Sequence, residues 1–309
     1  MNDILISGNS HRNKWKEKLC QLPINLILFL LAVSTVIPFL LLAMSSITDE
    51  NVLVQHGYSF FPEKISFAAY EYLFATGTKM IRAYVISILV TVIGTASSLL
   101  ITPMLAYALS RKDLPGRNAW LFFIFFTMLF SGGLTPSYMM WTRIFHIKNS
   151  ILSLIVPNLM VSAFNVILIK NYFVSNVPVE LLEAARMDGA GEFKVYFKIV
   201  LPVSTPIMAT VGLFVALGYW NDWQNGLYYL SGRTDLYSLQ NYLNKIMQDI
   251  QYLNSGINQA AMNNMQNITL PSTSIRMALS VLGIIPVMIL YPFFQKYFAK
   301  GITIGSVKG

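Results

Sequence analysis

Six charged side chains that could take part in chemistry gather in one short stretch, EAARMDGAGEFKVYFKIVLP, which runs from Glu183 to Pro202. Its DGAGEFK segment is superficially like a phosphate-binding loop. It lacks the Gly-Lys-Ser/Thr ending of a Walker A motif, which occurs nowhere in the chain. The three histidines, His11, His56 and His146, have neither metal-ligand spacing nor neighbours suited to nucleophilic catalysis. We therefore predict no catalytic, cofactor-binding or metal-binding residues and no ATPase site.

The overall composition places this charged stretch inside a membrane protein. The 309 residues are 55% hydrophobic and 12% charged, whereas soluble domains carry about 25% charged residues. So little charge cannot cover a water-exposed surface of this size, and we predict an all-α polytopic membrane protein. The net charge is +8, and the basic residues lie between apolar runs, where membrane topology explains them better than nucleic-acid binding. The single cysteine, Cys20, allows no internal disulfide.

Six segments are apolar enough to cross a bilayer, because a spanning helix needs about 20 apolar residues. The predicted spans lie near 22–46, 83–109, 119–141, 150–169, 200–221 and 277–295. Their interiors contain no Asp, Glu, His, Lys or Arg, although ion-coupled carriers usually place such residues inside the bilayer. If the chain moves a solute uphill, we expect the energy to enter from another subunit.

The distribution of basic residues sets the predicted orientation. With the N-terminus in the cytoplasm, most of the 22 Lys and Arg residues fall on inner segments. Both termini are then cytoplasmic tails, 1–21 and 299–309, on either side of a single transmembrane domain, 22–298. The charged stretch lies in an inner loop, 176–202. The larger outer segments are 47–82 and 222–276.

The inner loop has the residues of a helical hairpin. Pro178 suits the first turn of a helix, and Gly189 can take the left-handed conformation that ends one. Glu192 then opens a second helix, in which Phe193 and Phe197 form an apolar ridge. Such a hairpin must bury its apolar face on the bilayer surface, on its own protein or in a groove of a soluble partner, and the pattern leaves these three open.

The spacing within this hairpin resembles the signature loop of the membrane subunits of ATP-binding-cassette importers. That loop reads Glu-Ala-Ala, three residues, Gly, nine residues, Ile, one residue, Leu-Pro, and every interval is matched here. The resemblance implies that the loop docks into a cleft of a separate ATPase subunit and transmits its closure to the spans. The ATPase-coupling residues that it implies are Glu183, Ala184, Ala185, Asp188, Gly189, Ile199, Leu201 and Pro202.

Three further segments are similar to parts of carbohydrate-importer permeases of the maltose type. FFPEKISFAAYEYLF, residues 60–74, resembles the segment after their first span, and YPFFQKYFAKGITIGSVKG, residues 291–309, resembles their C-terminal signature. LFSGGLTPSYM, residues 129–139, resembles the branch associated with oligosaccharides and polysaccharide fragments. The chain is thus identified as a permease subunit of a carbohydrate importer in a bacterial plasma membrane, from about residue 20 onward.

The resemblance implies the type I importer fold and a larger assembly. It predicts a heterodimer with a second homologous permease, two ATP-binding-cassette ATPase subunits that use the ATP, and an extracytoplasmic solute-binding protein. Two alternatives stay open: a permease of the same superfamily for a non-sugar solute such as spermidine, phosphate or an amino acid, and an ion-coupled carrier that transports alone. A scaffold or receptor without transport would not need the signature loop.

Two segments near the outer ends of spans are candidates for the solute pathway. SGGLTP, residues 131–136, is expected to interrupt the third span, which suggests a cavity wall, although close helix packing through glycine explains it equally well. YWNDWQNGLYY, residues 219–229, combines rings with polar groups as a sugar site does, but the interfacial aromatic belt accounts for most of it. The pathway candidates are Ser131, Gly132, Gly133, Trp220, Asn221 and Asp222.

The second outer segment also contains a predicted helix, within LYSLQNYLNKIMQDI. Leu239, Leu243, Ile246 and Ile250 share one face of it. A run rich in Asn and Gln follows, between residues 248 and 267. The segment is too long for a minimal connector, so it is either a docking surface for an extracytoplasmic partner or a lid on its own protein.

Overall fold

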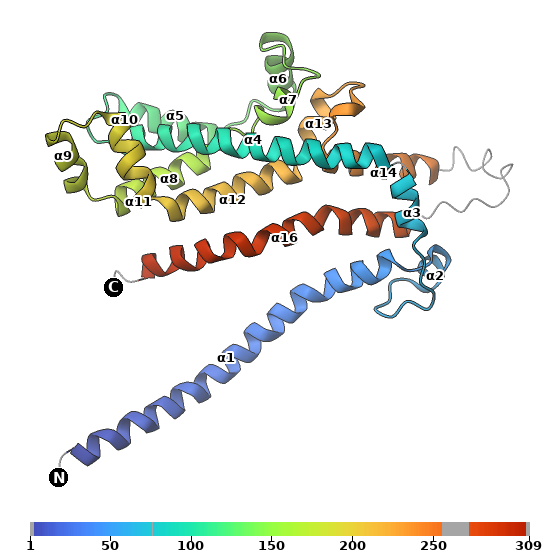
Figure 1. The fold of residues 1–309 in the computed structure, drawn as a ribbon, viewed down its shortest axis with the longest axis horizontal. Coiled ribbons are helices and arrows are strands. Elements are labelled where there is room, and N and C mark those ends of the chain that lie inside the picture. Colours follow the sequence, from blue (N-terminus) through green and yellow to red (C-terminus); the bar gives the residue numbers. More distant parts are fainter. Residues whose placement is uncertain (1–2, 76, 255–271, 307–309) are drawn as a thin grey trace. The chain divides into compact units, whose positions relative to one another are not determined.

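The computed structural model describes residues 3–75, 77–254 and 272–306, and within these ranges the chain forms helices (Figure 1). The extended pairing found there is an isolated bridge between Thr48 and Ile65. The prediction of an all-α chain is confirmed. The chain divides into two compact units: Met1–Leu73 with Asn267–Leu282, and Phe74–Gln266 with Gly283–Gly309.

The first unit contains a long helix with an uncovered apolar surface. Its helices are α1 (Asp3–Ser46), α2 (Glu50–His56), α3 (Ala68–Ala75) and the beginning of α16 (Ser272–Ser306). Within α1, the segment Pro23–Ser46 is long and apolar enough to cross a membrane, and side chains from Pro23 to Leu40 are exposed. An apolar surface of this length requires lipid or protein to cover it.

In the first unit, a carboxylate joins α2 to the first turn of α16. The Glu50 carboxylate accepts hydrogen bonds from the backbone amides of Thr273 and Ser274, each at 2.8 Å. These amides lie in the first turn of α16, where amides have no partner within the helix and the helix dipole favours a negative charge. The Glu50 side chain therefore caps the N-terminus of α16, although Glu50 is distant from α16 in the sequence.

The second unit is built around α4. Its elements are α4 (Gly77–Ser110), α5 (Arg117–Leu129), α6 (Leu134–Met139), the π-helix Met140–Ile144, α7 (Leu152–Ile155), α8 (Ala163–Asn176), α9 (Val179–Met187), α10 (Glu192–Val195), the π-helix Tyr196–Val200, α11 (Leu201–Val203), α12 (Thr205–Asn221), α13 (Gln224–Tyr229), the 3₁₀ turn Thr234–Leu236, α14 (Leu239–Asn254) and the rest of α16. Helix α4 packs against α8 and α12, which lie beside it in Figure 1.

Small residues let α4 and α12 approach closely. Gly94, Ser98 and Thr102 are buried on α4, which agrees with packing rather than solute binding for this part of the second predicted span. A Cβ atom at Gly94 would lie 2.4 Å from the Tyr219 ring, so a larger residue cannot be accommodated without movement. The Tyr219 hydroxyl donates to the Ile155 carbonyl at 2.7 Å, which fixes the ring in this position.

Two of the predicted spans coincide with sharply bent pairs of helices. Among the described residues, α1 and α4 each contain a segment long and apolar enough to cross a membrane, and up to four such spans result if each bent pair is one span. One pair joins α5 to the segment Leu134–Ile144 at 115°, and the other joins Glu192–Val203 to α12 at 83°. The first bend lies at SGGLTP, so the predicted interruption there is confirmed.

The predicted span near 150–169 is not one continuous helix. It is divided into α7 and α8 by non-helical backbone, at which Pro157 lies and Asn158 has a positive φ of 63°. Proline has no amide hydrogen to donate, so the helix ends near it. The sequence window was apolar throughout, and this shows that hydropathy alone does not locate such a break.

The amphipathic helix predicted in the outer segment is α14. Leu239, Leu243 and Ile250 are buried, and the Leu239 amide donates to the Ser87 hydroxyl on α4 at 2.7 Å. The buried face confirms the predicted periodicity and shows that this part of the segment packs on its own protein. Most of the Asn- and Gln-rich run at 248–267 lies outside the described residues.

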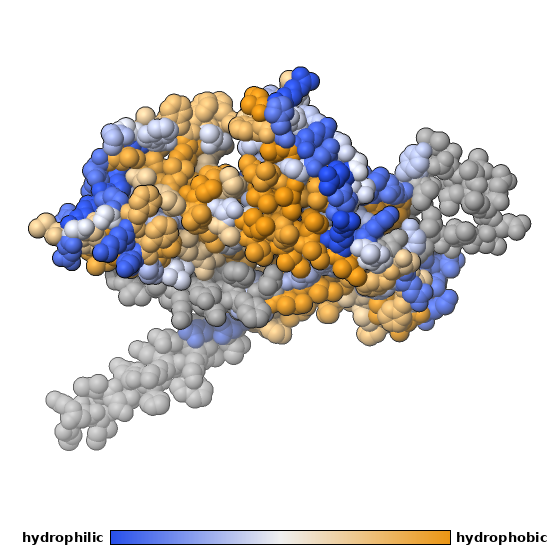
Figure 2. Space-filling view, turned by 45° about the horizontal axis from the view of Figure 1, so that its top comes forward, coloured by the Kyte–Doolittle hydropathy of each residue, from blue (hydrophilic) through white to orange (hydrophobic). Residues whose placement is uncertain are grey.

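In Figure 2, hydrophilic side chains gather at the end where α9 and α10 lie and in a second band farther to the right, and a broad hydrophobic area lies between them. The exposed apolar residues of the second unit include many on α4 and α5. A surface of this kind is typical of a chain surrounded by lipid or by other membrane subunits.

Candidate functional site

The predicted hairpin is formed by α9 and α10, with a turn at Gly189. Gly189 has a φ of +77°, which confirms the predicted left-handed conformation. The Ala190 amide donates to the Ala185 carbonyl at 3.0 Å, and the Gly189 amide donates to the Arg186 carbonyl at 2.9 Å. These two bonds form a Schellman motif, which satisfies the last carbonyls of α9 and fixes the direction in which the chain leaves the helix.

The second arm of the hairpin turns one apolar face outward. Phe193 is 70% exposed and Phe197 is 45% exposed, so the predicted ridge exists and is uncovered in this chain. Val195 and Tyr196 are buried on the other side of the same arm. After Pro202 the chain bends by 83° into α12, so the arm leads directly into an apolar helix.

The residues predicted to couple to an ATPase fall into two groups. Glu183, Ala184, Asp188, Gly189 and Pro202 are exposed, whereas Ala185, Ile199 and Leu201 are half-buried. Ala185 and Leu201 pack against the hydrophobic core of the second unit. Of the two alanines in this predicted set, Ala184 is exposed and available to a partner, whereas Ala185 is turned toward the core.

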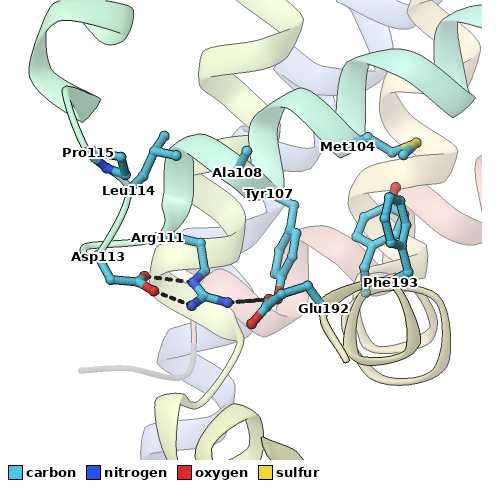
Figure 3. A pocket seen from close by; sticks show the side chains of 10 residues that line it. Met104, Tyr107, Ala108, Arg111, Asp113, Leu114, Pro115, Glu192 and Phe193 are labelled. Carbon is cyan, nitrogen blue, oxygen red and sulfur yellow. Dashed lines mark hydrogen bonds and ion pairs between the residues drawn. The ribbon is translucent and has the colours of Figure 1, made fainter. Parts of the chain in front are cut away.

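An ion-pair cluster holds the hairpin against the end of α4 (Figure 3). Glu192, the first residue of α10, accepts a hydrogen bond from the Tyr107 hydroxyl at 2.9 Å and pairs with the Arg111 guanidinium. The Arg186 Nε atom of α9 lies 3.1 Å from the other Glu192 oxygen. Arg111 also binds Asp113, with 2.8 Å between Nε and Oδ1, and this pairing lowers the pKa of the Asp113 carboxyl to about 2.

A pocket opens beside this cluster. Its volume is about 440 Å³, and it lies between the last turns of α4, the following loop and the second arm of the hairpin (Figure 3). Apolar side chains form much of its wall, with Arg111, Asp113 and Glu192 among its charged residues. Within the described ranges, no group of three His, Cys, Asp or Glu residues has the proximity needed to hold a metal ion.

The first group of pathway candidates lies at the bend of the third predicted span. Ser131, Gly132 and Gly133 are exposed in the non-helical segment between α5 and α6. Gly133 has a φ of +85°, and its amide donates a hydrogen bond to the Ser131 hydroxyl at 3.2 Å. The segment is therefore a defined turn with backbone groups open to its surroundings.

In the second group of pathway candidates, Trp220 and Asp222 make their hydrogen bonds within the protein. Trp220 is 5% exposed, and its indole N–H donates to the Gly283 carbonyl at 3.1 Å. One Asp222 oxygen accepts from the amides of Gln224 and Asn225, at 3.2 and 3.3 Å, and so caps α13. Burial raises the pKa of the Asp222 carboxyl to about 6, against the effect of these hydrogen bonds. Asn221 is exposed.

The helices that follow these two groups meet through a pair of stacked rings. Tyr138 of α6 lies over Tyr229 of α13, with 5.8 Å between ring centroids and 11° between planes. Trp220 approaches Tyr84, near the start of α4, with 6.4 Å between ring centroids, whereas Glu192 pairs with Arg111, which directly follows the end of α4. Tyr84 and Arg111 are about 40 Å apart at 1.5 Å per residue, which is enough to separate the two faces of a bilayer.

The sequence indicated the hairpin but not the cluster that holds it. Arg111 counted only among the basic residues of the inner segments, and Tyr107 was not singled out. A signal existed, because Arg111 directly follows an apolar helix that ends beside the inner loop in the predicted topology. The pairing with Glu192 joins residues 81 positions apart, and no local pattern specifies it.

Comparison with known proteins agrees with the signature spacing. The family described as binding-protein-dependent transport system inner membrane component matches residues 73–304. The polygalacturonan/rhamnogalacturonan transport system permease protein YtcP of Bacillus subtilis (strain 168) is 37% identical over 95% of this chain and 100% of its own. Protein LplC of the same organism is 39% identical over 89% of this chain and 90% of its own.

A solved structure extends the agreement to the fold. A chain from the crystal structure of a bacterial ABC transporter involved in the import of the acidic polysaccharide alginate superimposes with a TM-score of 0.74. It is 30% identical and covers 92% of this chain and 98% of its own. The family expected from the Glu183–Pro202 spacing is confirmed. The chain belongs to the family of binding-protein-dependent transport system inner membrane components, and it is an all-α membrane protein of the bacterial plasma membrane.

Proposed function

We propose that this chain is a translocation subunit of an ATP-driven importer and that residues 176–202 form the cytoplasmic loop that couples it to separate ATPase subunits. The observation that carries the proposal is the hairpin itself. Its turn is fixed by a Schellman motif, its second arm presents an apolar ridge, and Glu183 and Ala184 are exposed on its first arm. A rigid exposed hairpin with uncovered aromatic rings suits a groove in a soluble partner.

The proposed solute is a carbohydrate, in the form of an oligosaccharide or a polysaccharide fragment. Support comes from relatives whose names refer to polygalacturonan and rhamnogalacturonan, and from the alginate importer among the solved structures. A more distant relative, 27% identical, is an arabinooligosaccharides transport system permease. Both charged and neutral sugars therefore belong among the solutes to test.

The proposed assembly contains a second, homologous permease, two ATPase subunits and an extracytoplasmic solute-binding protein. The uncovered apolar side chains of α1 and α5 need lipid or a second membrane subunit to cover them. The absence of ionisable residues from the six predicted span interiors favours energy from ATP over ion coupling. Six spans with both termini in the cytoplasm remain the topology that we propose.

The test is uptake by the complete complex, co-expressed with its partner subunits and reconstituted into liposomes. We expect ATP-dependent import of at least one probe among labelled trigalacturonate, arabinotriose and raffinose when the binding protein is present. Import of phosphate or spermidine instead would support the non-sugar alternative. Uptake by this chain alone, driven by an ion gradient without ATP, would support the secondary-carrier alternative.

A further inference from the structure

The carboxylate of Glu192 is shared by donors from both sides of the hairpin root. Arg186 comes from the last turn of α9, Tyr107 from the last turn of α4, and Arg111 directly follows α4. Figure 3 shows Arg111 held between Asp113 on one side and Glu192 on the other. A carboxylate has lone pairs for all of these donors, so one side chain joins two helices to the start of a third.

This cluster differs from an ordinary surface ion pair. Exposed pairs contribute little because water screens them and both side chains lose freedom. The Arg111 side chain is 15% exposed, whereas the Glu192 and Asp113 side chains are 51% and 67% exposed, so the cluster is shielded from water on its guanidinium side. The planar guanidinium donates to Asp113 and Glu192 along different edges. Asp113 thereby orients the guanidinium, and the guanidinium in turn orients Glu192.

The other side-chain contacts of α9 with the core are made by half-buried residues. No residue of α9, all of which the structure describes, is fully buried, and Leu182 and Ala185 are half-buried against the core. Through the backbone, α9 leads to α10 and then to α12. The Glu192 cluster connects it also to α4, which is distant in the sequence and packs along α12 and α8.

We propose that Glu192 is a positioning residue that relays movement of α9 to α4. The inference rests on the proposed function, in which α9 moves with an ATPase. The backbone transmits this movement to α12, while the Glu192 carboxylate makes the end of α4 follow at the same time. Without this link, α9 and α12 can shift while α4 stays behind, and ATP is hydrolysed without opening the pathway.

The first experiment measures solute imported per ATP hydrolysed by the complete complex in liposomes, with labelled trigalacturonate as the probe. We expect Glu192→Gln to co-purify with its ATPase and to hydrolyse ATP, while import per ATP falls roughly five- to tenfold, the size of a typical coupling effect. Arg111→Lys keeps the positive charge but loses the planar guanidinium that donates to two carboxylates, so a smaller fall in import per ATP is expected. The matched control is Glu71→Gln, an exposed carboxylate in the first turn of α3 outside the coupling loop, which should leave the ratio unchanged.

A second experiment does not depend on the solute. Spin labels are attached at Lys112→Cys and Met187→Cys, both exposed, in a Cys20→Ser background of the complete complex. In the parent protein we expect the distance between the labels to stay the same when ATP closes the ATPases, because α9 and the end of α4 move together. With Glu192→Gln added, the distance should change or its distribution should broaden.

The outcomes separate the relay from the proposed function. An unchanged import-to-ATP ratio in Glu192→Gln, or an equal loss in Glu71→Gln, overturns the relay. A distance that already changes with ATP in the parent protein overturns it as well. If the parent complex hydrolyses ATP but imports no probe, the proposed solute is wrong and the distance measurement still decides on the relay. If the Glu192→Gln variant does not assemble with its partner subunits, the relay is tested by the import-to-ATP ratio of Arg111→Lys and by the distance between the spin labels in the parent protein.

Discussion

Aromatic and acidic side chains that lie near the two ends of α4 have different roles. At the hairpin end, the rings of Phe193 and Phe197 stay exposed, and the acid Glu192 binds side chains of other elements. At the other end, Trp220 is buried and Asp222 caps the adjacent helix. Rings that remain exposed after folding leave apolar area for a partner, whereas buried rings already stabilise the chain. The hairpin is therefore the better candidate for a docking surface.

The largest expected effect is at the buried end. Trp220→Ala should lower the free energy of unfolding by about 3–5 kcal/mol, because it removes a buried indole and leaves a cavity. Trp223→Ala, at a partly exposed neighbour, should cost about 1 kcal/mol or less. Thermal unfolding in detergent, followed by size-exclusion chromatography, measures both. A stable Trp220→Ala variant that no longer imports solute would instead place the indole in the pathway and break the contrast between the ends.

The next effect concerns the turn of the hairpin. Gly189→Val should cost about 1–3 kcal/mol locally, because a β-branched residue is strained at a φ of +77°. The ATPase should then co-purify poorly while the chain still inserts into the membrane. Gly191→Ala is the matched control, since Gly191 has a φ of −69° and both glycines have open space where a Cβ would lie. Equal co-purification of the two variants would mean that the turn does not position a docking surface.

A smaller effect tests which alanine faces the partner. Ala184→Leu should leave thermal stability within about 0.5 kcal/mol of the parent, because the side chain is exposed. It should nevertheless weaken ATPase co-purification by adding bulk to the docking surface. Ala185→Leu should reduce stability by about 1–3 kcal/mol, because the half-buried side chain packs against the core. The reverse pattern would show that α9 turns its other face to the partner.

The last expected effect is a dependence on pH at the buried end. Burial raises the pKa of Asp222 from 3.8 to about 6, so the folded chain binds the proton more tightly than the unfolded chain. Stability should therefore fall as pH rises through this window, and Asp222→Asn should flatten that part of the stability profile. Asp235→Asn is the control, because its ion pair with Arg233 lowers its pKa to about 2 and any effect lies at more acidic pH. A profile identical in Asp222→Asn would mean that the carboxyl is solvated and available to solute.

Features that depend on a few neighbouring residues were predictable. The left-handed Gly189, the ridge at Phe193 and Phe197, the break at SGGLTP and the buried face of α14 all agree with the structure. Each follows from backbone preferences or from hydrophobic periodicity within a few turns. The break between α7 and α8 was missed because an apolar window hides the effect of Pro157.

The amino-acid sequence by itself determined the helical class, the hairpin with its signature spacing and the family to which that spacing belongs. Tertiary structure alone decided that Trp220 is buried, that Ala185 faces inward, and that Glu192 joins Arg186, Tyr107 and Arg111. The physical reason is the range of the interactions. Helix and turn preferences act through backbone conformations and hydrogen bonds between residues up to five positions apart. The Glu192 cluster instead requires that α4 and the hairpin have already packed side by side, so its partners are chosen by distance in space and not by distance along the chain.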